Sequence, residues 1–470
     1  MVVRRPATRL DPVVLAIVAA AAVARLVRLD LMEFKFDEAE ACRLALHVLG
    51  YSEPGVGRFF PTEGLKASVA VPNPPLFVYL VAIPLAIVRS PLAVAAAIAA
   101  ANVVAVWLCV LVGTRIYSRF VGVAAAALYA AAPWSVVFSR KIWAQDLLPI
   151  VTGLFLLELH ALVVERRRRA PATLVLLSAA ATQLHFSALI LVPVAIAALI
   201  LARDAVDPRP LALGLAGAVV LYLPFLIGHG GSILHGHAHS ASTPPDAVHR
   251  LVNTIHLTEA VASADQLDHL VDWSTRLAEP IGLALGAAAF IGLALACRGR
   301  GGDPRTRLRA LLLAWYVLPA ATLTVIPATA YIHYFIVLFP LPFLGVAAAL
   351  EGLRRRARTV PFALVCLAVA YFAFVDVRLF ERVRDHDGSS ADYGVAYRSK
   401  NALVENVRRS APGATLSFTA SGIGAGSEYT LLAWLHDLDE HGPVRRYAVV
   451  ERPPAGAHGL RSGPLVAVAR

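Results

Sequence analysis

The sequence predicts a polytopic α-helical membrane protein that ends in a small α/β domain. Of its 470 residues, 58% are hydrophobic and only 16% are charged, with a mean hydropathy of +0.65, a composition typical of membrane chains rather than soluble globular ones. The arginines gather in short clusters between apolar runs, as expected when positive charge sets membrane topology. We therefore interpret the net charge of +11 as a topology signal and expect no nucleic-acid partner.

The apolar runs and basic clusters together predict about eleven transmembrane helices. Three arginines precede the first run and place the N-terminus in the cytoplasm. Later basic clusters fall on the same side only if the segment 171–202 forms two short spans that meet outside. The expected spans are 10–29, 91–113, 120–137, 147–164, two within 171–202, 211–227, 281–297, 310–326, 331–350 and 361–375, which leaves the C-terminus outside.

Two shorter helical segments are expected on the outer surface. Apolar residues recur at helical spacing over 38–49, which indicates an amphipathic helix lying on the membrane. The run 73–88 would reach only about 22 Å, short of the hydrocarbon core of about 30 Å. We expect it to form a juxtamembrane helix that does not cross the membrane.

The chain divides into two expected domains. Residues 1–378 form a membrane module with outer loops at 30–90 and 228–276, and residues 379–470 form an extracytoplasmic domain. Helix-like patterns at 395–408 and 428–438 alternate with strand-like patterns at 415–419, 447–451 and 465–469, which predicts a small α/β fold.

The predicted topology brings polar residues from distant segments to one outer face: Asp37, Glu38, Asn73, Arg140, Lys141, Asp146, His185 and His333. Two adjacent carboxylates at the end of a membrane helix are costly unless an aqueous cavity receives them. Carboxylates beside cations suit group transfer from a phosphate-bearing donor, because one can accept a proton while the cations hold the leaving phosphate. The alternatives are a solvated first helical turn for the acids and headgroup anchoring for the basic pair.

A histidine-rich segment follows in the second outer loop. His229, His235, His237 and His239 could bind a divalent metal ion. However, glycines surround them and no acidic ligand is fixed beside them, so a mobile loop that covers an acceptor site is the other interpretation. No cofactor is otherwise implied.

In three motifs the chain resembles the GT-C membrane glycosyltransferases, and in particular the branch of protein O-mannosyltransferases and lipid A aminoarabinose transferases. The motifs are the acidic pair after the first span, the Pro74-Pro75-Leu76 start of the juxtamembrane helix, and the stretch from Ser139 to Asp146. The resemblance covers roughly 10–350 and is stronger in the first half. It implies a GT-C-like fold and an inverting transferase at the outer face of the cytoplasmic membrane.

The resemblance also implies roles and partners. The donor would be a polyprenyl-phosphate sugar and the acceptor a protein, a lipid or a polysaccharide. Asp37 would be the general base, assisted by Glu38 and Asp146, and the phosphate would meet Arg140, Lys141, His185 and His333. His185 stands where relatives often carry lysine, and Asp146 lies one residue further from Arg140 than in the O-mannosyltransferase pattern. Asn73, Lys66 and Trp143 are expected donor or acceptor contacts.

Two other classes of function remain open on the sequence. A transporter or flippase would need charges lining a path through the bilayer, but most of the candidate polar residues fall at one face. A structural scaffold would leave that clustering without a reason.

Overall fold

The computed structural model describes residues 11–53, 56–65, 72–235, 246–299, 302–325, 330–354, 356–420, 426–438, 442–453 and 458–469, with side chains at 230–235 left aside. Most of the described chain is helical. The α-helices are α1 (Pro12–Leu26), α2 (Phe36–Val48), α3 (Leu76–Ile87), α4 (Pro91–Ile116), α5 (Arg119–Ala131), α6 (Pro133–Phe138), α7 (Leu148–Val163), α8 (Ala170–Leu184), α9 (Leu191–Leu201), α10 (Pro208–His235), α11 (Ala247–Ala260), α12 (Asp268–Val271), α13 (Ala278–Ala296), α14 (Pro304–Val325), α15 (Leu341–Arg354), α16 (Thr359–Asp385), α17 (Tyr397–Ser410) and α18 (Ser427–His436).

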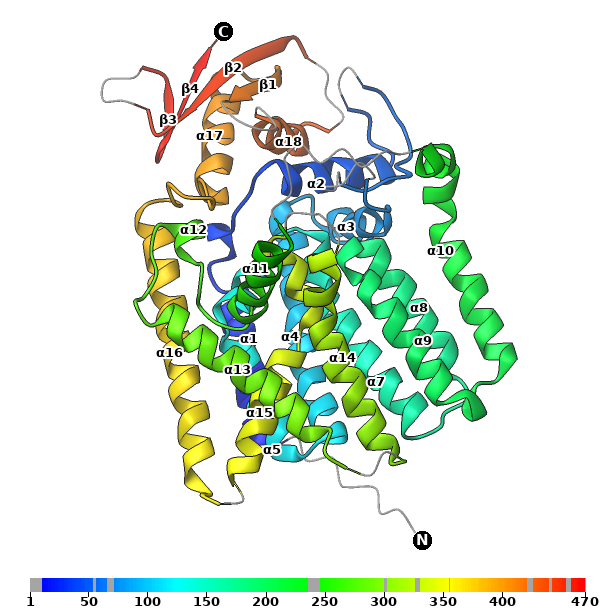
Figure 1. Ribbon diagram of the computed structural model, residues 1–470. Coiled ribbons are helices and arrows are strands. Elements are labelled where there is room, and N and C mark those ends of the chain that lie inside the picture. Colours follow the sequence, from blue (N-terminus) through cyan, green and yellow to red (C-terminus); the bar gives the residue numbers. More distant parts are fainter. Residues whose placement is uncertain are drawn as a thin grey trace.

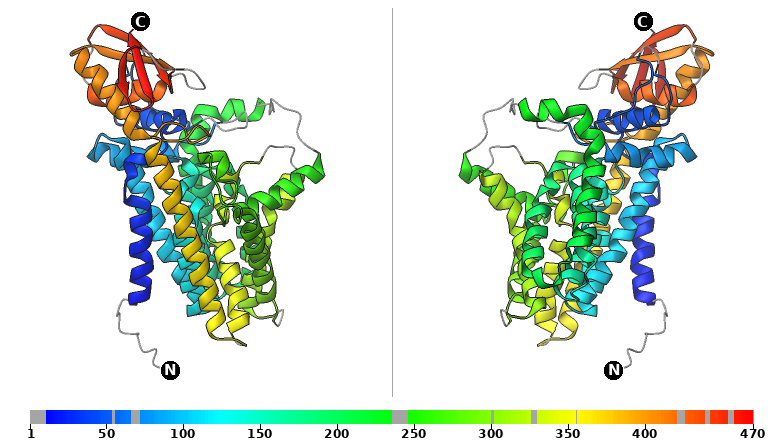
Figure 2. Two further views of the ribbon diagram at one scale, coloured as in Figure 1. Left: turned by 90° about the vertical axis from the view of Figure 1, so that its left-hand side faces the viewer. Right: turned by 90° about the vertical axis from the view of Figure 1, so that its right-hand side faces the viewer.

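The long helices stand side by side as a bundle (Figures 1 and 2). Among the described residues, six helices are long and apolar enough to cross a membrane, or seven if one bent pair counts as a single span. Large apolar side chains such as Ile87, Leu213 and Ile227 are exposed on the outside of the bundle, which suits contact with lipid rather than water. The protein is therefore an integral membrane protein.

Small residues let the helices approach closely. A Cβ added to Gly292 of α13 would stand only 1.9 Å from the carbonyl oxygen of Gly345 in α15, and one added to Gly345 would stand 2.4 Å from that of Ala289. Such contacts between small residues are a common way to pack membrane helices, because van der Waals contact between backbones replaces the hydrophobic effect.

Several predicted segments are broken where proline interrupts the helical hydrogen bonding. The run predicted at 120–137 is split into α5 and α6 at Pro133. The run predicted at 331–350 consists of a 3₁₀ helix, η5 (Ile332–Leu338), followed by α15. The two are bent by 58° relative to each other, and Pro340 lies at the break between them. The prediction of two helices within 171–202 is confirmed, since α8 ends at Leu184 and a second helical run begins at Phe186.

The prediction of a polar loop over 228–276 is wrong in its first part. Helix α10 continues through His229 to His235, and α11 and α12 occupy much of the remainder. Tertiary contacts explain why the glycines do not end the helix: Gly228 packs against Thr62, and His229 Nε2 lies 2.6 Å from a carboxylate oxygen of Glu63. Packing thus outweighs the weak helix propensity of glycine.

Helices α2 and α3 lie across one end of the bundle, and the C-terminal residues stand above them (Figure 1). The four strands are β1 (Thr415–Ala420), β2 (Val444–Glu451), β3 (Leu460–Ser462) and β4 (Leu465–Ala469), in the order β1-β2-β4-β3. Strands β1 and β2 are parallel and joined through α18, whereas β4 pairs antiparallel with β2 and β3. The alternation of helices and strands matches the sequence pattern, apart from β3.

Candidate active site

Helix α2 begins with the acidic pair, and its first turn fixes the two carboxylates differently. The Lys35 backbone N–H donates to Glu38 Oε2 at 2.9 Å, which satisfies a donor that precedes the helix. Glu38 is fully buried, whereas Asp37 is exposed and makes no hydrogen bond or ion pair within the described chain. Glu38 therefore stabilises the start of α2, and Asp37 is the acid that can meet a substrate.

A carboxylate that sequence reasoning missed, Glu33, organises the cations of the site. Its side chain is inaccessible to solvent, and its two oxygens lie 2.5 Å from Lys35 Nζ and 2.6 Å from Lys141 Nζ. Lys141 is itself buried, and its ammonium lies 3.4 Å from the centre of the Trp143 ring. A buried charge needs such partners, so Glu33 holds Lys141 beside the acidic pair. Its position between Met32 and Phe34, at the end of the first apolar run, is the signal that could have identified it.

The acids and cations shift one another's pKa values. Desolvation by surrounding protein raises the pKa of the exposed Asp37, while Lys141 and Lys35 oppose that rise. Burial raises the pKa of Glu38 to about 7, with Lys141 again opposing. Burial alone would lower the pKa of Lys35, but the Glu33 carboxylate outweighs it and raises the pKa. Lys141 and Lys35 thus both act on the two members of the acidic pair, and Lys141 has the larger effect on each.

Asp146 lies in a 3₁₀ turn, η2 (Ala144–Leu147), immediately before α7. Asp146 Oδ2 accepts from the Trp143 backbone N–H at 3.2 Å, and the Asp146 carbonyl accepts from the Asn102 side chain at 2.8 Å. The other carboxylate oxygen, Oδ1, is buried and has no hydrogen-bond partner among the described residues. Asn102 on α4, also absent from the sequence-based candidates, therefore anchors the turn that carries Asp146.

Arg140 faces away from the acids although it adjoins Lys141. Its guanidinium donates to the backbone carbonyls of Ala24, Val27 and Arg28 at 3.0, 2.8 and 2.6 Å, and it stacks over Phe380 at 4.4 Å. Carbonyls at the end of a helix have no partner within that helix, so Arg140 caps α1. This geometry favours a structural role for Arg140 over the expected phosphate contact.

The two candidate histidines form an aromatic wall with Trp143. His333 meets the Trp143 ring edge-on at 5.1 Å between centroids, and His185 lies 6.2 Å from His333 and 5.3 Å from Tyr334. Burial lowers the pKa of His185 to about 4, so it is a neutral hydrogen-bonding group at pH 7. The Trp143 indole nitrogen is buried without a partner among the described residues. The structure thus brings Trp143, His185 and His333 together next to Lys141.

The remaining candidates lie elsewhere or outside the described residues. Asn73 is buried and holds Leu65 through its side-chain amide at 3.2 Å and its backbone N–H at 2.9 Å, which ties the loop before α3. Lys66, His237 and His239 fall outside the described residues, as does the side chain of His235. No group of three or more histidine, cysteine or acidic side chains in the described chain is arranged to hold a metal ion.

An apolar groove of about 530 Å³ opens beside this site between α3, α4, α7 and α8. It is lined by Leu76, Phe77, Leu80, Val81, Ile83, Pro84, Val94, Ala97, Ile98, Leu147, Ile150, Val151, Ala180, Leu184 and Leu221. Leu147 directly follows Asp146, and Leu184 directly precedes His185. Two residues that line the groove thus adjoin members of the polar cluster along the chain.

Comparisons with known proteins identify the fold. No family model matches the sequence, and no curated protein matches it. Among solved structures, ArnT from Cupriavidus metallidurans bound to undecaprenyl phosphate aligns over 97% of both chains, with a TM-score of 0.59 and 14% identity. AglB, an oligosaccharyltransferase from Archaeoglobus fulgidus in complex with an inhibitory peptide and a dolichol-phosphate, aligns over 90% of this chain and 63% of its own, with a TM-score of 0.51 and 13% identity.

Both solved structures are GT-C glycosyltransferases. At these identities the likeness concerns the fold alone. This chain therefore has the GT-C fold, and the resemblance expected from the sequence is confirmed at that level.

Proposed function

We propose that this chain is a membrane glycosyltransferase that moves a sugar from a polyprenyl phosphate to an acceptor hydroxyl. The observation that carries the proposal is the position of Asp37: an exposed carboxylate without a partner in the described chain, beside the buried cation Lys141. A general base needs access to the proton that it removes, and a leaving phosphate needs a fixed positive charge. The two groups stand together at one end of a GT-C fold.

The reaction would be a single displacement with inversion at the sugar carbon. The acceptor hydroxyl loses its proton to Asp37 as its oxygen bonds to the anomeric carbon. The bond from that carbon to the phosphate oxygen breaks, and the polyprenyl phosphate leaves with the electron pair. Lys141 stabilises the leaving charge, because an ammonium has three N–H donors and its pairing with Glu33 occupies only part of them.

Neutral donors would complete the phosphate site. The Trp143 indole N–H lacks a partner among the described residues, and His185 and His333 stand beside it. Neutral hydrogen bonds orient a phosphate without adding charge. Asp146, with one free oxygen, would accept a hydroxyl of the donor sugar.

The apolar groove supports a lipid-linked donor. A polyprenyl chain lying along α3 and α4 would bury apolar surface and would bring its phosphate to the end of the groove, next to Asp146 and His185. ArnT was solved with undecaprenyl phosphate and AglB with a dolichol-phosphate, which supports the same donor class here.

We propose the same membrane topology for the chain as the one predicted from its sequence. Eleven crossings follow if the seven spans identified by length are joined by the shorter apolar helices α1, α5, α8 and the run from Phe186 to Leu201, with α3 remaining on the surface. The active site would then face outward from the cytoplasmic membrane, with an extracytoplasmic C-terminal domain from about residue 379. Buried charges of the described chain gather mainly near that end, which favours a transferase over a transporter.

The test is transfer of radiolabelled sugar from polyprenyl-phosphate donors in membranes that contain the wild type or Asp37→Asn. The substitution keeps the shape of the side chain but cannot accept the proton, so transfer should fall by about 10²- to 10⁴-fold. Asp30→Asn is the matched control. Among the described residues Asp30 makes its ion pair with the exposed Arg28 alone, so this substitution should leave transfer unchanged. An active Asp37→Asn variant would refute the proposed base.

A further inference from the structure

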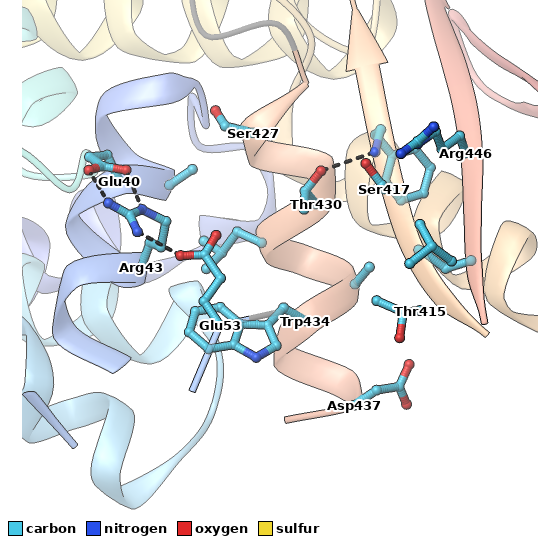
Figure 3. A pocket seen from close by; sticks show the side chains of 16 residues that line it. Glu40, Arg43, Glu53, Thr415, Ser417, Ser427, Thr430, Trp434, Asp437 and Arg446 are labelled. Carbon is cyan, nitrogen blue, oxygen red and sulfur yellow. Dashed lines mark hydrogen bonds and ion pairs between the residues drawn. The ribbon is translucent and has the colours of Figure 1, made fainter. Parts of the chain in front are cut away.

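A second polar cleft lies between α2 and the C-terminal sheet (Figure 3). Its volume is about 440 Å³. Glu40, Arg43 and Glu53 form one wall, and α18 with strands β1 and β2 forms the other. The cleft thus lies between α2, the surface helix that carries Asp37, and the C-terminal residues.

The wall on the α2 side is a fixed carboxylate network. Arg43 pairs with both oxygens of Glu40 at 2.7 Å each and with Glu53 at 2.6 Å. His47 Nε2 lies 3.3 Å from the same Glu53 oxygen. These pairs orient the two carboxylates and use the positive charge of Arg43, while the carboxylates keep lone pairs that can accept further hydrogen bonds.

The opposite wall supplies hydroxyls, an indole and a cation. Ser417 on β1 and Arg446 on β2 are directly paired across the strands, and both line the cleft with Trp434 and Asp437. Trp434 is only 7% exposed, and its indole nitrogen has no hydrogen-bond partner in the described chain. Arg446, by contrast, is an exposed residue and makes no ion pair with a described residue.

The charges decide which ligand class fits. Three carboxylates, those of Glu40, Glu53 and Asp437, line the cleft. Arg43 pairs with the first two, and Arg408 lies 3.7 Å from the third. With Arg446 the positive and negative charges are therefore roughly equal, and no excess of positive charge is left to attract an anion. This balance disfavours a phosphate or another anion. Carboxylates accept hydrogen bonds from hydroxyl groups, an indole offers both an N–H and an apolar face, and Arg446 donates to hydroxyl oxygens. A neutral saccharide presents the matching groups.

We propose that this cleft binds a neutral stretch of an acceptor glycan. The inference rests on the proposed function in one respect: Glu40 lies three residues after Asp37 on α2, so the two side chains share a face of the helix about one turn apart. A glycan held in the cleft would deliver its terminal hydroxyl to Asp37. In this proposal the C-terminal sheet helps to recognise the acceptor by binding its sugar residues.

The test measures binding of neutral hexasaccharides of mannose, glucose and arabinose to the detergent-solubilised full chain by calorimetry. At least one should bind, and Arg446→Ala should weaken its Kd by about tenfold because a charge-assisted hydrogen bond is lost. Arg445→Ala is the matched control: it is exposed on the same strand but points to the opposite face and should change nothing. Trp434→Phe, which keeps an aromatic ring but lacks the N–H, should also weaken binding.

Several outcomes would overturn the proposal. They are failure of all three neutral probes to bind, tighter binding of an acidic galacturonate hexasaccharide, or equal effects of Arg446→Ala and Arg445→Ala. Binding to Asp37→Asn separates this proposal from the function. If a neutral hexasaccharide binds that variant normally while transfer is lost, both glycan binding in the cleft and the proposed transferase function are supported. If it binds but the wild type transfers no sugar, only the proposed function fails.

Discussion

Adjacent cations Arg140 and Lys141 should have separable roles, and substituting each in turn tests the geometry of the site. Arg140→Ala removes three short hydrogen bonds to the carbonyls that end α1, at 2.6, 2.8 and 3.0 Å. A hydrogen bond to a charged group contributes about 1.5–3 kcal/mol, so even at the low end of this range the loss of three should cost about 4–5 kcal/mol. Lys141→Met keeps an apolar side chain of similar length beside Trp143 but removes the ammonium that lies over the Trp143 ring.

The assay is thermal unfolding in detergent together with transfer measured at saturating and limiting donor. Arg140→Ala should lower the melting temperature by about 5 °C or more, with the protein that remains folded retaining its KM for the donor. Lys141→Met should unfold closer to the wild type, because Glu33 keeps Lys35 at 2.5 Å, yet lose transfer by about 10²-fold or more. The opposite pattern, with Arg140→Ala stable but unable to use donor, would refute this assignment.

Three further predictions address pH, stability and the lipid groove. Desolvation raises the pKa of Asp37, and a base works only when it is ionised. The kcat/KM for transfer should therefore rise with pH, with a midpoint above the usual pKa of aspartate, about 3.9. A pH profile that is flat down to pH 4 would contradict this. Burial raises the pKa of Glu38 to about 7, so the stability that its protonated form provides is present at low pH and is lost as pH rises towards 7. Glu38→Gln can still accept the hydrogen bond from the Lys35 N–H. Its melting temperature relative to that of the wild type should therefore increase between pH 5 and pH 8. A difference in melting temperature that stays constant over this range would argue against a raised pKa of Glu38. Ala97→Trp fills the apolar groove from an exposed position on α4 and should raise the KM for a polyprenyl donor by about tenfold. Val104→Trp lies on the same helix but outside the groove and should leave this KM unchanged. Equal effects of the two substitutions would exclude the groove as the donor site.

The sequence predicted the parts of this structure that depend on hydrophobic pattern and charge. The two helices that meet near His185, the surface helix after the first span and the alternation of helices and strands after residue 395 all agree with the structure. These features follow from periodicity and from turn residues, which are local properties.

Features that depend on tertiary contact were missed. Glu33 gave only a weak signal as one acid in a charged stretch, and its pairing with Lys141 depends on a contact between residues 108 positions apart. Arg140 and Lys141 are indistinguishable by composition, but one caps α1 and the other meets Glu33. The extension of α10 past Gly228 also required contacts with Thr62 and Glu63. The cleft lined by Arg446 and Trp434 is formed by residues about 400 positions from α2.

The most direct test of the account separates donor binding from chemistry at Asp37. Binding of a polyprenyl-phosphate sugar and its single-turnover transfer would be measured on the same preparations of wild type and Asp37→Asn. Asp37→Asn should bind the donor within about threefold of the wild type, while its transfer rate should fall by about 10²-fold or more. Loss of donor binding with an unchanged rate for the bound donor would contradict the role of Asp37 as the base that activates the acceptor.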